Sequence, residues 1–188
     1  MDNRVNILEQ AVVLFSSRGY DAVGVQEIVE KSGITKPTLY HYFGSKKGLL
    51  ENLLKVNYDE FTKKLLITAG YKGDLVLTLR EIVQEYFNLA KNAPVFFRMQ
   101  LAMQFLPVDN EAYQMVLPYI DKHYNLIENV FIKAVKENGN MEGRHKRYAA
   151  TFIGMINTYA AMSLNAQFEL SKEQEYLAVH QFMHGILS

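Results

Sequence analysis

The sequence contains no cysteine, so neither a disulfide framework nor a thiolate metal site is possible. Tryptophan is also absent, and only four prolines occur in 188 residues, which leaves room for long helices. No run of about 18 apolar residues is present, so we expect no transmembrane helix. The residues after Met1 lead directly into an amphipathic pattern. We therefore expect no signal peptide, and we predict a cytoplasmic protein.

An excess of charge of either sign is also lacking, because 20 basic residues balance 20 acidic ones. The balance is uneven along the chain, however. Residues 31–47 hold four lysines and one histidine but no acid: Lys31, Lys36, His41, Lys46 and Lys47. Such a patch is a weak indication of a polyanionic partner, and taken alone it is more often a solvated face.

Signatures of catalysis are missing as well. There is no glycine-rich phosphate loop, no nucleophile elbow, no two-histidine metal signature and no carboxylate pair in an apolar setting. His180 and His184 are four residues apart, but Glu173 and Glu175 lie more than one helical turn away. We considered an enzyme as a rival class and predict instead a protein without catalytic activity, bound metal or cofactor.

What the sequence does contain is helical periodicity with a globular composition. Leu8, Ala11, Val12 and Phe15 recur at helical spacing, and no segment alternates as a strand would. We predict an all-α fold of about nine helices. The expected ranges are 3–18, 25–31, 36–43, 46–69, a fifth after Asp74, a sixth from Pro94 to before Pro107, 109–140 with a kink or restart at Pro118, 143–167, and a ninth after Ser171.

The predicted domain boundary lies at the start of the long fourth helix. Residues 1–47 form a compact three-helix unit, which we interpret as a helix-turn-helix DNA-binding domain. Residues 48–188 form a larger helical body, in which we expect effector binding and dimerisation. A chain of this length can hold a small domain and a larger one.

The helices at 25–31 and 36–43, joined by a tight turn with a central glycine, are typical of a helix-turn-helix. At 100° per residue, Leu39 and Phe43 face inward, whereas Pro37 and His41 point outward. The outer face carries hydroxyl, imidazole, phenol and ammonium groups, which suit phosphates and base edges. Ser45, Lys46 and Lys47 then begin the next helix and form a second candidate anion site. A three-helix packing unit without DNA binding is the alternative.

Five stretches carry a resemblance to a known family: ILEQAVVLF (7–15), RGYDA (18–22), VQEIV (25–29), SGITKPTLYHYF (32–43) and GSKKGLL (44–50). Residues 7–54 closely resemble the N-terminal domain of the tetracycline-repressor (TetR) family. The all-helical remainder is similar to that family in its helix number, although its sequence is not diagnostic.

This resemblance implies a dimeric repressor that leaves its operator when a small molecule binds the body. The implied DNA contacts are Thr35, Lys36, Pro37, Thr38, Tyr40, His41 and Lys46. Tyr40 and Lys46 would hold phosphates, and Lys36, Pro37 and Thr38 would read bases. The family often has a threonine at the start of the second helix, where this chain has Gly24 and Val25. That contact must therefore come from Gln26 or from a backbone amide, or it is not made at all.

Large adaptable side chains are concentrated in the body. Clusters of methionine and aromatic residues are usually core, but the resemblance favours a cavity for an apolar or aromatic effector. The candidate effector residues are Tyr58, Phe61, Phe87, Phe97, Met99, Met103, Tyr119 and His123. His123 taken alone is more often a core or surface histidine. The alternative is a DNA-binding protein of the same fold that is controlled by a protein partner.

The last two helices are candidates for dimerisation. The eighth carries small residues, and the ninth has one apolar stripe, formed by Tyr176, Val179, Met183 and Ile186. Packing within the chain would explain both patterns. The resemblance implies instead a four-helix interface between two copies, which would read a near-palindromic operator.

Overall fold

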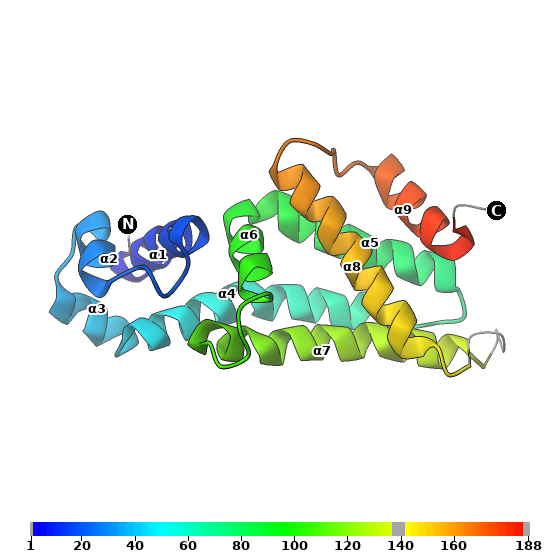
Figure 1. Ribbon diagram of the computed structural model, residues 1–188, viewed down its shortest axis with the longest axis horizontal. Helices are drawn as coiled ribbons and strands as arrows, with labels where there is room; N and C mark the ends of the chain where they lie inside the picture. The colour runs from blue at the N-terminus through cyan, green and yellow to red at the C-terminus, as the bar shows by residue number, and fades with distance from the viewer. Residues whose placement is uncertain (1, 137–141, 186–188) are drawn as a thin grey trace. The chain divides into compact units, whose positions relative to one another are not determined.

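The computed structural model describes residues 2–136 and 142–185, and within them all regular structure is α-helical. Nine helices occur in this part of the chain, which confirms the predicted all-α class (Figure 1). They are α1 (Asn3–Arg18), α2 (Val25–Ser32), α3 (Lys36–Phe43), α4 (Lys46–Thr68), α5 (Leu75–Asn92), α6 (Pro94–Met103), α7 (Glu111–Ala134), α8 (His145–Leu164) and α9 (Lys172–His184).

Short polar side chains mark where several of these helices begin, because they accept hydrogen bonds from first-turn amides that have no partner inside the helix. Asp74 accepts from the backbone amide of Leu77 at 2.8 Å, and Ser171 accepts from that of Gln174 at 3.3 Å. Ser45 does the same for Gly48 at 2.9 Å. The helices predicted to begin after Asp74, Ser171 and Ser45 are therefore capped by these three residues.

Of the kink or restart expected at Pro118, helix α7 excludes the restart, and the helix also begins later than expected. It is a single helix with Pro118 inside it, so the chain does not restart there. Asn110 rather than Asp109 precedes the helix, and its Oδ1 accepts from the amides of Ala112 and Tyr113 at 2.9 and 3.3 Å. The helix ends at Ala134, and the end predicted at 138–140 lies outside the described residues.

The chain divides into two compact units. Unit 1 combines Met1–Asp59 with Val95–Pro118, and unit 2 combines Glu60–Pro94 with Tyr119–Ser188. Helix α4 runs without a break through the boundary that we predicted after residue 47. The boundary after residue 47 therefore stays a prediction about function. In the packing of the chain, the first three helices belong to the same unit as the later segment Val95–Pro118.

In unit 1, α1 packs on α2 and α2 packs on α3, at the blue end of the chain in Figure 1. Ile7, Phe15 and Ile28 are buried between these helices together with Leu39. Burying one such side chain contributes about 1.5–3 kcal/mol. A small three-helix unit can therefore be held together by a few apolar positions.

In unit 2, α5 packs against both α8 and α9 (Figure 1). Phe131 of α7 and Phe152 of α8 meet edge to face with ring centroids 6.2 Å apart, and Phe182 of α9 lies against Phe152 at 5.0 Å. Within residues 2–136 and 142–185, no helix has the length and apolar character needed to cross a membrane.

Candidate DNA-binding interface

Helix α3 is framed by residues that fix both of its ends. Thr35 precedes it, and its hydroxyl lies 3.4 Å from the backbone amide of Thr38 and 2.9 Å from that residue's hydroxyl. Pro37 falls in the first turn, where a missing N–H costs no helical hydrogen bond. Gly44 closes the helix with φ of 72°, and its amide donates to the carbonyl of Tyr40 at 2.8 Å.

The turn between α2 and α3 depends on Gly33. This residue adopts φ of 65° and ψ of 32°, in the left-handed region where a side chain is strained. The amide of Ile34 donates back to the carbonyl of Val29 at 3.0 Å. The tight turn predicted from the sequence therefore holds α2 and α3 as a helix-turn-helix.

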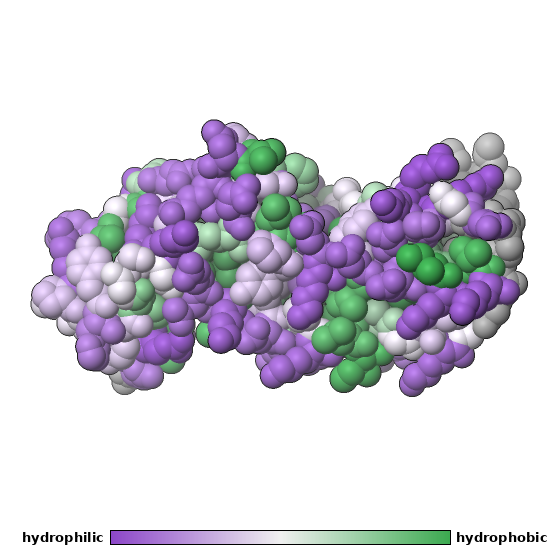
Figure 2. Space-filling view, turned by 90° about the horizontal axis from the view of Figure 1, so that it is seen from below, coloured by the Kyte–Doolittle hydropathy of each residue, from purple (hydrophilic) through white to green (hydrophobic). Residues whose placement is uncertain are grey.

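Two faces of α3 are distinct. Leu39 is fully buried and Phe43 is 7% exposed, which confirms that they face inward. Lys36, Pro37 and His41 are exposed, as is the Tyr40 side chain at 45%. Thr38 is half-buried. In the face seen in Figure 2, the α1–α3 end of unit 1, at the left, shows mostly hydrophilic and neutral residues.

Tyr42 is an exposed aromatic residue that the sequence reasoning did not include. Its side chain is 38% exposed, and its ring meets that of His41 edge to face at 5.5 Å. Helical spacing places residue 42 seven positions after Thr35, on nearly the same side of the helix. That spacing could have identified it as a further candidate for DNA contact.

Gln26, for which a phosphate contact is predicted, lies in the first turn of α2. Gly24 precedes the helix and supplies no side-chain cap, so the first-turn amides have no partner of that kind. The Gln26 side chain is exposed and donates to a Glu30 carboxylate oxygen at 2.6 Å. A phosphate contact at Gln26 would require this amide to leave Glu30.

The two lysines at the start of α4 have different surroundings. Lys47 is exposed, and its ammonium lies 4.0 Å from a carboxylate oxygen of Glu111. Lys46 is half-buried, and its ammonium donates to the backbone carbonyls of Tyr20 and Val23, each at 3.0 Å. Only the third N–H of the Lys46 ammonium remains for the phosphate contact that the resemblance implies.

Near the start of α4, the backbone at Gly48 lies very close to the backbone at Phe43. A Cβ placed on Gly48 would lie 2.1 Å from the carbonyl oxygen of Phe43. No side chain fits there without a shift of the backbone. Gly48 therefore permits the short connection from α3 to α4.

The eight predicted effector residues are divided between the two units. Tyr58, Phe97, Met99 and Met103 belong to unit 1, and Phe61, Phe87, Tyr119 and His123 belong to unit 2. Seven of the eight are buried, and Tyr119 is half-buried. Their role in effector binding stays a prediction.

Each unit contains a polar group among these buried side chains. In unit 1 the Tyr58 hydroxyl donates to the Gln100 side chain at 3.0 Å. In unit 2 the Thr62 hydroxyl lies 2.8 Å from Nε2 of His123. Burial, and to a smaller extent the charge of Lys122, lower the pKa of His123 to about 4. The imidazole is therefore neutral near pH 7.

A separate surface pocket in unit 2 has a volume of about 590 Å³ and lies around the loop after α8. None of the eight predicted effector residues lines it. Its walls are Lys91, Ser163, Ala166, Gln167, Phe168, Glu169 and Leu170.

The faces of α8 and α9 fit the dimer prediction only in part. Ala150, Gly154 and Thr158 form an exposed small-residue face on α8. On α9, Tyr176 and Met183 are exposed, whereas Val179 is 1% exposed. At Val179 the alternative of packing within the chain holds, because this side chain is already buried in the single chain. Ile186 lies outside the described residues.

Within the described part of the chain, no group of three or more histidine or acidic side chains could hold a metal.

The fold and the exposed α3 face define a helix-turn-helix DNA-binding protein. Residues 7–53 match the sequence profile of the bacterial regulatory proteins of the tetR family. The N-terminal region is therefore a DNA-binding domain of the TetR type, and the chain is similar to DNA-binding transcriptional regulators of that family. The family match also confirms the prediction that the chain is not an enzyme.

Individual relatives agree with this assignment. The chain is 37% identical over 111 residues to the uncharacterized regulator YuxN of Bacillus subtilis, a match that covers 57% of this chain but only 37% of YuxN. It is 24% identical over 190 residues to the transcriptional activator FasR of Mycolicibacterium smegmatis, which covers 100% of this chain and 84% of FasR.

Among solved structures, the fold is similar to that of the regulator FadR from Bacillus subtilis in complex with stearoyl-CoA. The TM-score is 0.79 at 18% identity, with 97% of this chain and 98% of FadR covered. At this identity the likeness concerns the fold.

Proposed function

We propose that the protein is a cytoplasmic repressor that binds a near-palindromic operator as a homodimer and is released by a small apolar or aromatic effector. The observation that carries the DNA-binding part is the exposed face of α3, where Lys36, Pro37 and His41 point outward while Leu39 and Phe43 anchor the helix from behind. Thr35, Thr38, Tyr40 and Gln26 complete the proposed DNA contacts.

Binding to DNA from the protein's own upstream region, measured at several salt concentrations, tests this proposal. We expect sequence-selective binding that weakens with salt, because each neutralised phosphate contributes about 0.9 to the slope of log K against log salt. Lys36→Ala is expected to cost about 1–3 kcal/mol of binding free energy and to change the preferred base, since Lys36 is proposed to read base edges.

Lys72→Ala is the matched control, because it removes the same charge from an exposed position in the loop between α4 and α5 in unit 2. It should leave both affinity and base preference unchanged. If the wild-type protein shows no salt-dependent, sequence-selective binding, the proposed function is wrong.

Homodimerisation through α8 and α9 can be tested at Gly154. A Cβ at this exposed position meets no atom within 4 Å, so a larger side chain can be accommodated in the single chain. We expect Gly154→Arg to fold normally but to behave as a monomer in light scattering, and to lose most of its operator affinity. A wild-type protein that is monomeric at micromolar concentration would contradict the dimer.

The proposed effector is an apolar molecule, and the buried aromatic and methionine side chains of both units support this class. FadR was solved with stearoyl-CoA, so stearoyl-CoA is a suitable probe and free coenzyme A its control. Release of DNA by stearoyl-CoA but not by coenzyme A supports an acyl effector. A reporter under the operator, read with and without the protein, decides between repression and activation.

The alternative is control by a protein partner. It would be favoured if apolar and aromatic probes neither raise the melting temperature of the protein nor release the DNA.

A further inference from the structure

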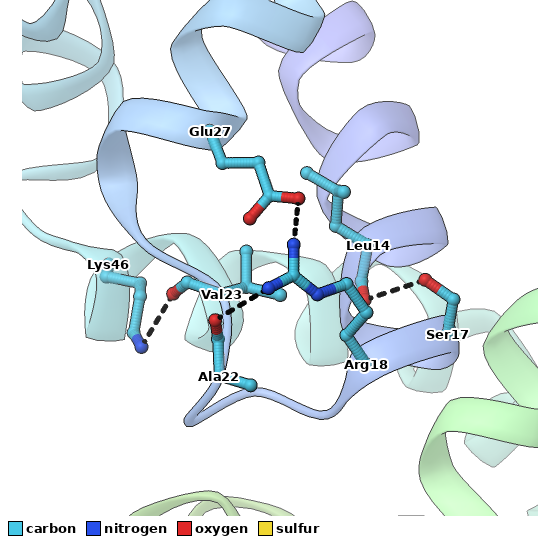
Figure 3. A network of polar contacts seen from close by, with 7 residues as sticks. All are labelled: Leu14, Ser17, Arg18, Ala22, Val23, Glu27 and Lys46. Carbon is cyan, nitrogen blue, oxygen red and sulfur yellow. Dashed lines mark hydrogen bonds and ion pairs between the residues drawn. The ribbon is translucent and has the colours of Figure 1, made fainter.

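Lys46 makes contacts that a phosphate-binding surface lysine would not need. Its ammonium donates to the carbonyls of Tyr20 and Val23, both at 3.0 Å, and lies 4.1 Å from the centroid of the Tyr20 ring. Figure 3 shows the side chain directed at the Val23 carbonyl. Both partners belong to the loop between α1 and α2, so Lys46 connects the start of α4 to that loop.

The side chains of this loop are anchored by burial of Tyr20 and Val23 and by the hydrogen bond from the Tyr20 hydroxyl to Glu111, whereas its carbonyls are bound by cations. Gly24 gives α2 no side-chain cap. The Tyr20 carbonyl also accepts from the Val23 amide at 3.3 Å, which folds the loop into a turn. On the other side of the loop, Arg18 pairs with Glu27 and donates to the Ala22 carbonyl at 3.5 Å (Figure 3). Two cations therefore bind the carbonyls of three loop residues.

The position of this loop determines where α2 begins, and α2 packs directly on α3. We infer that Lys46 is a positioning residue of the DNA-binding unit. It holds residues 20–24 in place and, through α2, orients α3, instead of neutralising a DNA phosphate. This inference rests on the proposed function at α3, and it departs from the phosphate contact that the family resemblance implies for Lys46.

The test compares Lys46→Met with Lys47→Met, which removes the same charge from the next residue. Affinity for the operator DNA is measured across a salt series, at a temperature where circular dichroism shows every variant to be fully folded. A residue that only stabilises the fold would then leave affinity unchanged. We expect Lys46→Met to lower affinity about tenfold, as for the loss of hydrogen bonds from a charged donor, without changing the salt slope.

Amide hydrogen exchange provides the structural measurement. Exchange at residues 20–24 should become faster in Lys46→Met and stay unchanged in Lys47→Met. Lys46→Arg, whose guanidinium can donate to both carbonyls, should restore slow exchange and most of the affinity. If Lys46→Met does not fold, Lys46→Gln replaces it, because its shorter, uncharged amide cannot reach both carbonyls, and exchange at residues 20–24 should again become faster.

A salt slope that becomes less steep by about 0.9 for each protomer bound would assign Lys46 to a phosphate and overturn the inference. Unchanged exchange at residues 20–24 in Lys46→Met would overturn it whatever the DNA result. Failure of the wild-type protein to bind DNA selectively would instead count against the proposed function, while the exchange measurement would still decide whether Lys46 holds the loop.

Discussion

Replacing Leu39 by alanine is expected to destabilise unit 1 by about 2–5 kcal/mol and to abolish selective DNA binding. Leu39 is fully buried in α3, and the cost arises from the lost transfer free energy together with the cavity left behind. Because α3 is only eight residues long, it depends on packing rather than on its own helical propensity. Loss of this anchor should therefore separate the recognition helix from α2.

The measurement is chemical denaturation followed by circular dichroism, combined with operator binding at a temperature where the variant is still folded. His41→Ala is the control on the same helix, because His41 is exposed. It should change the free energy of unfolding by less than about 0.5 kcal/mol while weakening DNA binding. If Leu39→Ala and His41→Ala destabilise the protein equally, the assignment of the two faces of α3 is wrong.

Acid is expected to destabilise the protein through His123. The folded pKa of about 4 lies below the ordinary value of 6.5, so between these values the unfolded chain binds a proton that the folded chain does not. Stability is therefore unaffected by this group above about pH 6.5 and falls as the pH drops towards 4. The full loss is about 3 kcal/mol, at about 1.4 kcal/mol for each unit of pKa difference.

The contribution of His123 is isolated by following the free energy of unfolding from pH 7.5 to pH 4 in the wild type and in His123→Gln. Glutamine cannot titrate but can still hydrogen bond to Thr62. The loss of stability with acid should therefore be smaller in this variant. His41→Gln, at an exposed position, should keep the wild-type pH dependence. Identical pH profiles for the wild type and His123→Gln would show that the imidazole is not held neutral by burial.

Local patterns accounted for most of the DNA-binding region. The predicted ranges of α1 and α3 agree with the structure, because capping residues, glycines and apolar spacing act over a few residues. The same reasoning separated Leu39 and Phe43 from the exposed side chains of α3. The family resemblance then supplied the roles of those side chains, which their spacing alone could not provide.

Contacts between distant residues were not predictable in this way. Nothing near Lys46 in the sequence indicates that its ammonium will meet carbonyls 23 and 26 residues earlier. The sequence left open whether Val179 on α9 packs inside the chain or against a second copy, because an apolar stripe looks the same in both cases. Tertiary packing determines both the contacts of Lys46 and the burial of Val179. Helical periodicity shows which residues share a face but not what that face packs against.

Unit 1 is built from two separate segments of the chain, and this affects the order in which the protein can fold. The Tyr20 hydroxyl donates to Glu111 at 2.7 Å, and the Asn110 side chain donates to Asp21 at 2.6 Å, so these contacts join residues 91 and 89 positions apart. During synthesis from the N-terminus, α1–α3 leave the ribosome long before their partners at the start of α7. Such non-local contacts form late because closing a long loop costs entropy first. The helix-turn-helix therefore exists for a time without the anchor that α7 provides.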